Sequence, residues 1–118
     1  MPLDVERSDL DSGVVVLSLS GRLTMGNQLQ HFEWTVTDLV KEQKNKIVLD
    51  LSGVDHLDSS GIGVLVNCNA VVRNAGGHLR LAGVADRVQA LFKMTGVNDL
   101  LKTDATREDA ISALSGNS

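Results

Sequence analysis

A cluster of hydroxyl and carboxylate side chains stands where a strand is expected to give way to a helix. Asp58, Ser59 and Ser60 follow a short apolar run at 46–51 and open a helical pattern over 60–75. The first backbone N–H groups of a helix lack partners within the helix, and the helix dipole favours negative charge there. A hydroxyl at this point is therefore placed to carry a phosphate, held by those N–H groups.

The simplest interpretation of Asp58 and Ser59 is a helix N-cap, because Asp and Ser are common at that position. This interpretation leaves Gly63 unexplained, since Gly inside a helix costs about 0.5–1 kcal/mol relative to Ala. Close approach of another chain is one reason for a small residue there. A phosphate on Ser59 would add about −1.5 to −2 charges beside Asp58 and near Asp55, which would repel a partner's surface.

A catalytic site built from Ser59, His56 and either Asp58 or Asp55 is a distant alternative. A catalytic triad needs an oriented contact between Ser and His, with a third group behind the His. Three residues within five on one turn seldom reach that geometry, and the chain has no Gly-x-Ser-x-Gly pattern. Hydrolase activity is therefore not expected.

No metal or cofactor site is expected from the motifs. The three histidines are scattered and Cys68 stands alone, so no metal-ligand spacing is present. Gly61-x-Gly63 is not a dinucleotide fingerprint, because Val66 occupies the position that needs Gly or Ala. Cys68 is expected to pack as a small hydrophobic side chain.

The composition limits the class of protein. The 118 residues are expected to form one domain over 1–118, with 42% apolar and 22% charged residues, as in globular proteins. A net charge of −4 argues against nucleic acid or an anionic membrane as the main partner. The single Cys and the N-terminus, which lacks a signal-peptide pattern, predict a cytoplasmic protein.

The hydrophobic pattern predicts strands alternating with helices after an opening hairpin, in the order ββαβαβαβα. Expected strands lie at 3–10, 14–19, 46–51, 78–82 and after 100–102, and the residues 21–24 are expected to leave the sheet. Asn27 is expected to cap the first helix, Gly96 to end the third, and Thr106–Asp109 to form a capping box before the last. Residues 116–118 are expected to fray. Such an order predicts an α/β fold with a mixed sheet backed by helices.

Two surfaces remain open to more than one interpretation. The helix after Ser59 is apolar on more than one side, so its own fold covers it on two sides or a partner covers an exposed face. Trp34 lies off the apolar stripe of its helix, and either packs at the sheet margin or forms an exposed interface anchor.

Several segments together resemble the STAS domain, specifically the bacterial anti-sigma factor antagonists. They span about residues 13–114, and the segment 58–63, Asp-Ser-Ser-Gly-Ile-Gly, is the most specific. The others are 16–23, 47–54, 75–81 and 88–96. The resemblance implies a STAS-like, or SpoIIAA-like, fold: a mixed, mostly parallel sheet of about five strands with helices packed mainly on one face.

The resemblance also implies a non-enzymatic regulator that works by partner switching. The unphosphorylated antagonist binds an anti-sigma factor that is also a GHKL-type serine kinase. The kinase then phosphorylates the first Ser after the Asp, here Ser59, the complex separates, and a serine phosphatase resets the cycle. The implied partner-binding residues are Thr24, Asp58, Ser59, Ser60, Gly61, Ile62 and Gly63.

One position departs from the family pattern. Many members have an Asp where this chain has Thr24, and that Asp belongs to the kinase-docking surface. The departure favours an alternative, a stand-alone STAS scaffold or transporter-associated subunit without a phosphorylation cycle, whereas Ser59 disfavours it. A third possibility is a sensor that binds a nucleotide or other anion at the turn. The expected oligomeric state is a monomer or a weak homodimer through Trp34 or the edge strand at 3–10.

Overall fold

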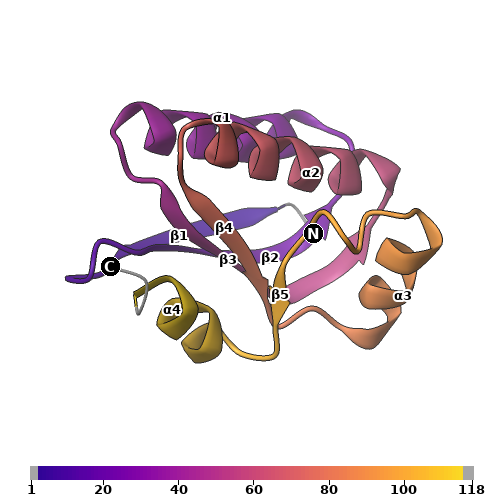
Figure 1. Ribbon diagram of the computed structural model, residues 1–118. Helices are drawn as coiled ribbons and strands as arrows, with labels where there is room; N and C mark the ends of the chain where they lie inside the picture. The colour runs from indigo at the N-terminus through magenta and orange to yellow at the C-terminus, as the bar shows by residue number, and fades with distance from the viewer. Residues whose placement is uncertain (1–2, 116–118) are drawn as a thin grey trace.

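A computed structural model describes residues 3–115 of the chain (Figure 1). Its elements follow the predicted order ββαβαβαβα. They are β1 (Asp4–Asp9), β2 (Val15–Leu23), α1 (Asn27–Lys41), β3 (Lys46–Leu57), α2 (Ser59–Asn74), β4 (His78–Ala82), α3 (Asp86–Met94), β5 (Thr103–Asp104) and α4 (Arg107–Ser115). The prediction that residues 116–118 fray concerns positions outside the described residues.

The five strands form one sheet in the order β1-β2-β3-β4-β5. The hairpin strand β1 runs antiparallel to β2, and the other neighbouring pairs are parallel. The predicted fold class, a mixed and mostly parallel sheet, is confirmed. Because parallel strands need crossover connections, α1 and α2 follow β2 and β3, which brings the start of α2 to the carboxyl end of β3.

The helices cover the two faces of the sheet unequally. In Figure 1, α1 and α2 lie side by side over one face and α4 lies under the other. Alternation along β2 explains this arrangement, because Leu17 and Leu19 join the large core under α1 and α2 while Val16 joins a smaller core against α4. On α1, the predicted stripe Leu29, Phe32, Val36 and Leu39 is buried.

Two strands run further than the sequence pattern predicted. The residues 21–23 were expected to leave the sheet, but β2 continues to Leu23, and β3 continues from Leu51 to Leu57. Gly21 has a φ of 99° next to a register shift between the strands, so a bulge allows the pairing to continue. The extension places the loop after β2 beside the start of α2.

The sequence predicted the N-cap of α4 correctly but not that of α1. Asn27 does not cap α1: the N-cap is Gly26, and no side chain makes the capping hydrogen bond. The cap before α4 is confirmed, since the Thr106 Oγ1 accepts a hydrogen bond of 3.1 Å from the Asp109 N–H.

The last helix is tied to the sheet by an ion pair. The Arg107 guanidinium lies 2.9 Å from the Asp50 Oδ2, and Asp50 is buried. Burial alone would raise the pKa of Asp50, but hydrogen bonds from Ser52 and Arg107 outweigh it and lower the pKa. The Asp50 carboxylate, on the α4 side of the sheet, therefore has a structural role, because it holds the start of α4 against the sheet.

Candidate functional site

Asp58 fixes the junction between β3 and α2. Its Oδ1 accepts a hydrogen bond of 2.9 Å from the Gly61 N–H, and its Oδ2 accepts one of 3.1 Å from the Met25 N–H. The first bond is the predicted N-cap of α2. The second joins this turn to the loop after β2, so that one carboxylate positions two separate segments.

The electrostatics of Asp58 follow from these bonds. Partial burial raises the pKa of its carboxyl group. The hydrogen bonds from the Gly61 and Met25 N–H groups lower the pKa by more than burial raises it, so the pKa lies below its ordinary value. Asp58 is therefore ionised at neutral pH, and its charge is satisfied by backbone donors at the helix start.

Ser59 is the first residue of α2 and is exposed. Within residues 3–115 the structure gives its hydroxyl no hydrogen-bond partner, whereas Ser60 beside it is half-buried. An exposed hydroxyl at a helix N-terminus is open to a second protein and lies near backbone N–H groups that favour an anion.

The two glycines of this turn have opposite surroundings. Gly61 is buried, and a Cβ added there would lie 2.0 Å from the Leu23 carbonyl oxygen, so only Gly lets α2 approach β2 this closely. Gly63 is exposed, and an added Cβ would meet no atom within 4 Å. Nothing within the described residues requires Gly at 63, which supports the prediction that another chain approaches there.

The predicted partner-binding residues therefore differ in burial. Gly61 and Ile62 are buried and hold the turn in place, while Ser59 and Gly63 are exposed. Thr24, Asp58 and Ser60 are half-buried. Thr24 also lines a cavity of about 70 Å³ between the end of β2 and the start of α1.

Met25 is a candidate that the sequence analysis missed. Its side chain is 78% exposed, and its backbone N–H is the donor to Asp58, so it stands at the edge of the Ser59 turn. A flexible, exposed Met suits a surface that binds another protein. No spacing signal marks Met25, because its proximity to Ser59 arises from the unpredicted extension of β2 and β3.

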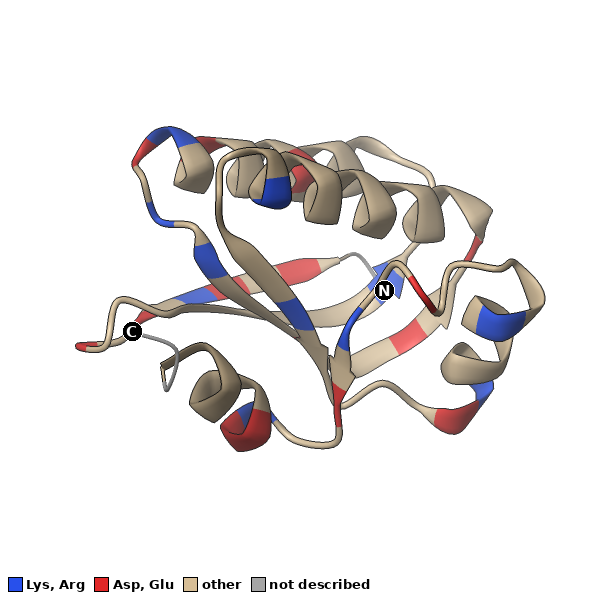
Figure 2. Ribbon diagram, viewed as in Figure 1, with Lys and Arg blue, Asp and Glu red and all other residues tan. Residues whose placement is uncertain are grey.

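The exposed side of α2 continues away from Ser59. Gly63, Asn67 and Ala70 are exposed on it, and Val66 is half-buried. Figure 2 shows the α2 ribbon without charge over most of its length, with one basic segment near its end. The other side of α2 is covered by its own fold, since Leu65, Cys68 and Val72 are buried. The fold therefore covers one side of this apolar helix and leaves the other side exposed, and coverage of that exposed side by a partner stays a prediction.

The sequence left open whether Trp34 packs at the sheet margin or is exposed, and the structure shows it exposed. Its side chain is 53% exposed on α1, and its ring stacks on His31 with centroids 5.5 Å apart. It therefore does not pack under the sheet margin. An exposed Trp is a possible binding anchor.

The residues of the catalytic alternative are not arranged as a triad. The His56 Nδ1 lies 3.1 Å from the Asp55 Oδ1, both side chains are exposed, and this hydrogen bond lowers the pKa of Asp55. The Asp58 carboxylate is occupied by the backbone donors of Gly61 and Met25. No hydrogen bond in the described chain joins His56 to Ser59.

Cys68 packs as predicted. It is buried in the main core, and burial raises the pKa of its thiol to about 12. Across residues 3–115, no three His, Cys, Asp or Glu side chains come together in a group that would hold a metal ion. In the same part of the chain, none of the helices combines the length and the apolar character that a membrane crossing requires.

The family model described as the STAS domain matches residues 7–110. An anti-sigma-B factor antagonist of Staphylococcus aureus is 27% identical over 108 residues, which cover 92% of this chain and 98% of that protein. The structure of a candidate anti-sigma factor antagonist from Thermotoga maritima superposes with a TM-score of 0.84 and is 27% identical, covering 93% of each chain.

A third similar protein is SpoIIAA of Bacillus. The structure of this anti-sigma factor antagonist in its unphosphorylated form has a TM-score of 0.76, covers 96% of this chain and 99% of its own, and is 18% identical. It confirms the SpoIIAA-like fold. The match to residues 7–110 shows that the chain belongs to the STAS domain family, among relatives named anti-sigma factor antagonists, which are non-enzymatic regulatory proteins.

Proposed function

We propose that this protein is an anti-sigma factor antagonist that regulates transcription by partner switching, with Ser59 as the phosphorylated residue. In this proposal the unphosphorylated protein binds a serine-kinase anti-sigma factor of the GHKL type, and phosphorylation of Ser59 releases it. A serine phosphatase restores the binding form. All three proteins would act in the cytoplasm.

The observation that carries the proposal is the placement of the Ser59 hydroxyl. It is exposed at the first position of α2, next to a carboxylate whose hydrogen bonds are already satisfied by Gly61 and Met25. Asp58 therefore holds the turn in shape without binding the hydroxyl. A kinase can reach such a group without unfolding the helix.

Charge explains how phosphorylation would release the partner. A phosphoserine carries about −1.5 to −2 charges at neutral pH, and the N–H groups at the helix start can hold it within the protein. The exposed side of α2 has no charged residue before Arg73. A partner that covers this uncharged side would have to desolvate the phosphate, which weakens the complex.

The relatives support this mechanism. The Staphylococcus aureus relative is named for antagonism of an anti-sigma factor, and SpoIIAA has been seen in both an unphosphorylated and a phosphorylated form. The present chain shares the fold of SpoIIAA and has an exposed Ser at the start of α2.

Thr24 bears on which kinase is the partner. It adjoins Met25, whose N–H is bonded to Asp58, so it lies at the edge of the proposed docking surface. A partner matched to this chain would face a neutral hydroxyl at 24 in place of the carboxylate of many relatives. We propose that the cognate kinase differs at this contact from kinases that dock on an Asp.

The proposed solution state is a monomer. The outer edge of the sheet is β1, where Asp4, Glu6, Arg7 and Asp9 are exposed. Charged residues on an edge strand oppose pairing with a second sheet. Light scattering coupled to size exclusion would show the mass of one chain, and a stable dimer mass would contradict this proposal.

Mapping of the phosphate tests the proposed function. Purified wild type, Ser59→Ala and Ser60→Ala would be incubated with ATP and an extract of the cells that produce the protein, and peptides would be analysed by mass spectrometry. Wild type and Ser60→Ala should carry phosphate on Ser59, and Ser59→Ala should carry none. Phosphate at another residue would contradict the assignment, and its absence from all three would favour the STAS scaffold without a phosphorylation cycle.

A further inference from the structure

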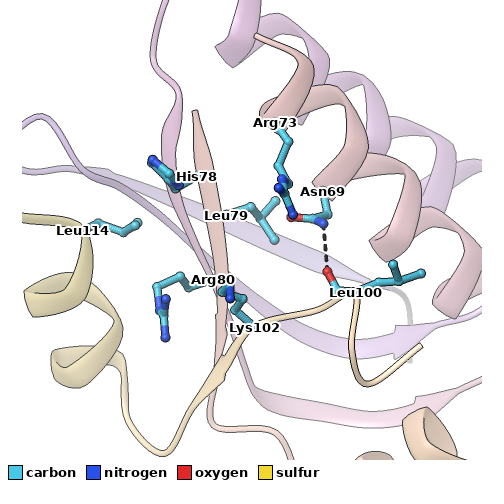
Figure 3. Close-up of a pocket in the computed structure, with 8 residues that line it drawn as sticks. All are labelled: Asn69, Arg73, His78, Leu79, Arg80, Leu100, Lys102 and Leu114. Carbon is cyan, nitrogen blue, oxygen red and sulfur yellow. Dashed lines mark hydrogen bonds between the residues drawn. The ribbon is translucent and has the colours of Figure 1, made fainter. Parts of the chain in front are cut away.

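A cavity lies at the opposite edge of the sheet from β1. It has a volume of about 310 Å³ and is lined by residues from the end of α2, β4, the segment before β5, and α4 (Figure 3). The lining residues of this edge cavity are Asn69, Arg73, His78, Leu79, Arg80, Leu100, Lys102 and Leu114. Its volume is at the lower limit of about 300–1,000 Å³ that is usual for small-ligand sites.

Positive charge gathers at the edge cavity although the protein carries a net charge of −4. Arg73 and Lys102 are exposed at its rim, and neither has a carboxylate partner among residues 3–115. Arg80 is paired with Asp104 by two hydrogen bonds of 2.6 Å and 3.1 Å, which neutralise it and fix its position. Two uncompensated cations therefore line the cavity, and His78 also lines it.

The strand edge adds a backbone donor. The His78 N–H donates to the Asn45 carbonyl on the β3 side, and the Leu81 N–H donates to the Lys102 carbonyl on the β5 side. Because N–H directions alternate along a strand, the Leu79 N–H is directed to the same side as that of Leu81. β5 contains only Thr103 and Asp104, so it does not reach Leu79. The alternation therefore directs this N–H to the edge of β4 that β5 leaves unpaired, on the side of the edge cavity.

Apolar side chains form the remaining walls. Leu79 belongs to the main core and Leu114 to the smaller core against α4, so they line the cavity from opposite faces of the sheet. Leu100 is 50% exposed at the mouth. The Asn69 Nδ2 donates a hydrogen bond of 2.9 Å to the Leu100 carbonyl, which holds this segment against α2 (Figure 3). The cavity is thus preformed, and Leu100 supplies an exposed apolar side chain at its mouth.

We propose that the edge cavity is a second binding site, for a small organic anion in which a phosphate or carboxylate is joined to an apolar body. Arg73 and Lys102 attract the anionic group, and the Leu79 N–H donates to it. The apolar body packs against Leu100, the exposed apolar side chain at the mouth of the cavity.

The end of α2 does not oppose an anion there. Carbonyl groups at a helix C-terminus repel negative charge when they are unpaired. Here the Arg73 and Val72 carbonyls accept hydrogen bonds from the Gly76 and Gly77 N–H groups, and the Ala75 carbonyl accepts one from Asn45. Their partial charges are therefore offset before a ligand arrives.

The edge cavity is independent of the Ser59 turn. Arg73 and Ser59 stand at opposite ends of α2, about 21 Å apart for 14 residues at the helical rise. A small ligand at one end would leave the protein-binding surface at the other end accessible, so this proposal does not rest on the proposed function.

The test is a titration followed by NMR of backbone amide signals. The probes are phenyl phosphate, phenylacetate, inorganic phosphate and phenol. Phenyl phosphate or phenylacetate should shift the signals of Leu79, Asn69 and Lys102 with saturation, and a dissociation constant of roughly 1–10 mM is expected for a ligand of this size. The tighter of these two probes identifies the anionic group as phosphate or carboxylate.

Variants locate the site. A double variant, Arg73→Gln with Lys102→Gln, should bind the anionic probe about fivefold to tenfold more weakly, because two exposed charge contacts are lost. Leu100→Ala should weaken phenyl phosphate but not inorganic phosphate. Arg22→Gln, an exposed Arg outside the cavity, is the matched control and should change nothing.

Three results would overturn the proposal. One is the absence of saturable shifts up to about 100 mM of either aromatic anion, about tenfold above the weak limit expected for this size. Another is equal binding of inorganic phosphate and phenyl phosphate, since no apolar body would then be recognised. The third is unchanged affinity in the double variant while its amide spectrum remains that of a folded protein.

Discussion

The first turn of α2 has one glycine on its inner side and another on its outer side, and the surroundings of the two glycines differ. On the inner side, Gly61 packs against the Leu23 carbonyl, with no room for a Cβ. On the outer side, Gly63 has open space around it and lies one turn from the exposed Ser59. The fold explains the first glycine and does not explain the second.

This contrast separates residues that build the site from residues that a partner would contact. Asp58 and Gly61 belong to the first group, because their contacts are within the chain. Ser59, Gly63 and Met25 belong to the second group, because they are exposed around the turn. Substitutions in the first group should reduce folding stability, and those in the second should change binding without reducing stability.

The largest effect on stability is expected from Gly61→Ala. The added Cβ would overlap the Leu23 carbonyl oxygen, so the start of α2 must move away from β2. Overpacking of this kind should lower the free energy of unfolding by about 2–3 kcal/mol. Denaturant unfolding measures it, and a loss below about 1 kcal/mol would show that the inner side is not tightly constrained.

A smaller loss is expected from Asp58→Ala. The variant loses the N-cap of α2 and the hydrogen bond to the Met25 N–H. Loss of an N-cap lowers the free energy of unfolding by about 1 kcal/mol. The same denaturant experiment measures it, with Asp11→Ala in the exposed hairpin turn as a control that should not change stability. Equal effects of the two substitutions would contradict the positioning role of Asp58.

Gly63→Ala is expected to stabilise the protein, unlike the two substitutions above. An added methyl group meets nothing and improves helix propensity, so the free energy of unfolding should rise by about 0.5–1 kcal/mol. Ala70→Gly, on the exposed side of the same helix, should lower it by a similar amount. If another chain approaches at 63, Gly63→Ala should also weaken binding of the cognate anti-sigma factor in calorimetry. Unchanged affinity would remove Gly63 from the docking surface.

The smallest effect concerns pH. Because the folded protein lowers the pKa of Asp58 below its ordinary value of 3.8, ionised Asp58 stabilises the fold above that pH. This contribution is lost as the pH falls through the lower pKa of the folded state. The difference in unfolding free energy between wild type and Asp58→Asn should therefore shrink below about pH 4. A difference that grows on acidification would contradict the sign of the shift.

The sequence predicted those parts of the fold that depend on local pattern. The strand His78–Ala82 was predicted at its observed bounds, and α2 began and ended within one residue of the expected range. The ends of β2 and β3 were missed because Gly21 and the Ser52-Gly53 pair resemble exits from a sheet. Their strand conformation depends on pairing between the two strands, which no local pattern records.

The site was predicted in the same partial way. Asp58 as N-cap and Ser59 as the exposed hydroxyl follow from residue types at a strand-to-helix junction. Met25 was missed because its hydrogen bond to Asp58 joins residues 33 apart in the chain. The edge cavity was missed for the same reason, since α2, β4 and the segment near Lys102 meet only in the folded protein.

The most direct test of the central claim is capture of the partner by three forms of the protein. Wild type, Ser59→Ala and Ser59→Asp would be used as baits in an extract of the cells that produce the protein, and captured proteins would be identified by mass spectrometry. The account predicts that wild type and Ser59→Ala retain a GHKL-type serine kinase and that Ser59→Asp loses it. Identical captures by all three baits, with no such kinase among them, would contradict it and reduce Ser59 to the first residue of a capped helix.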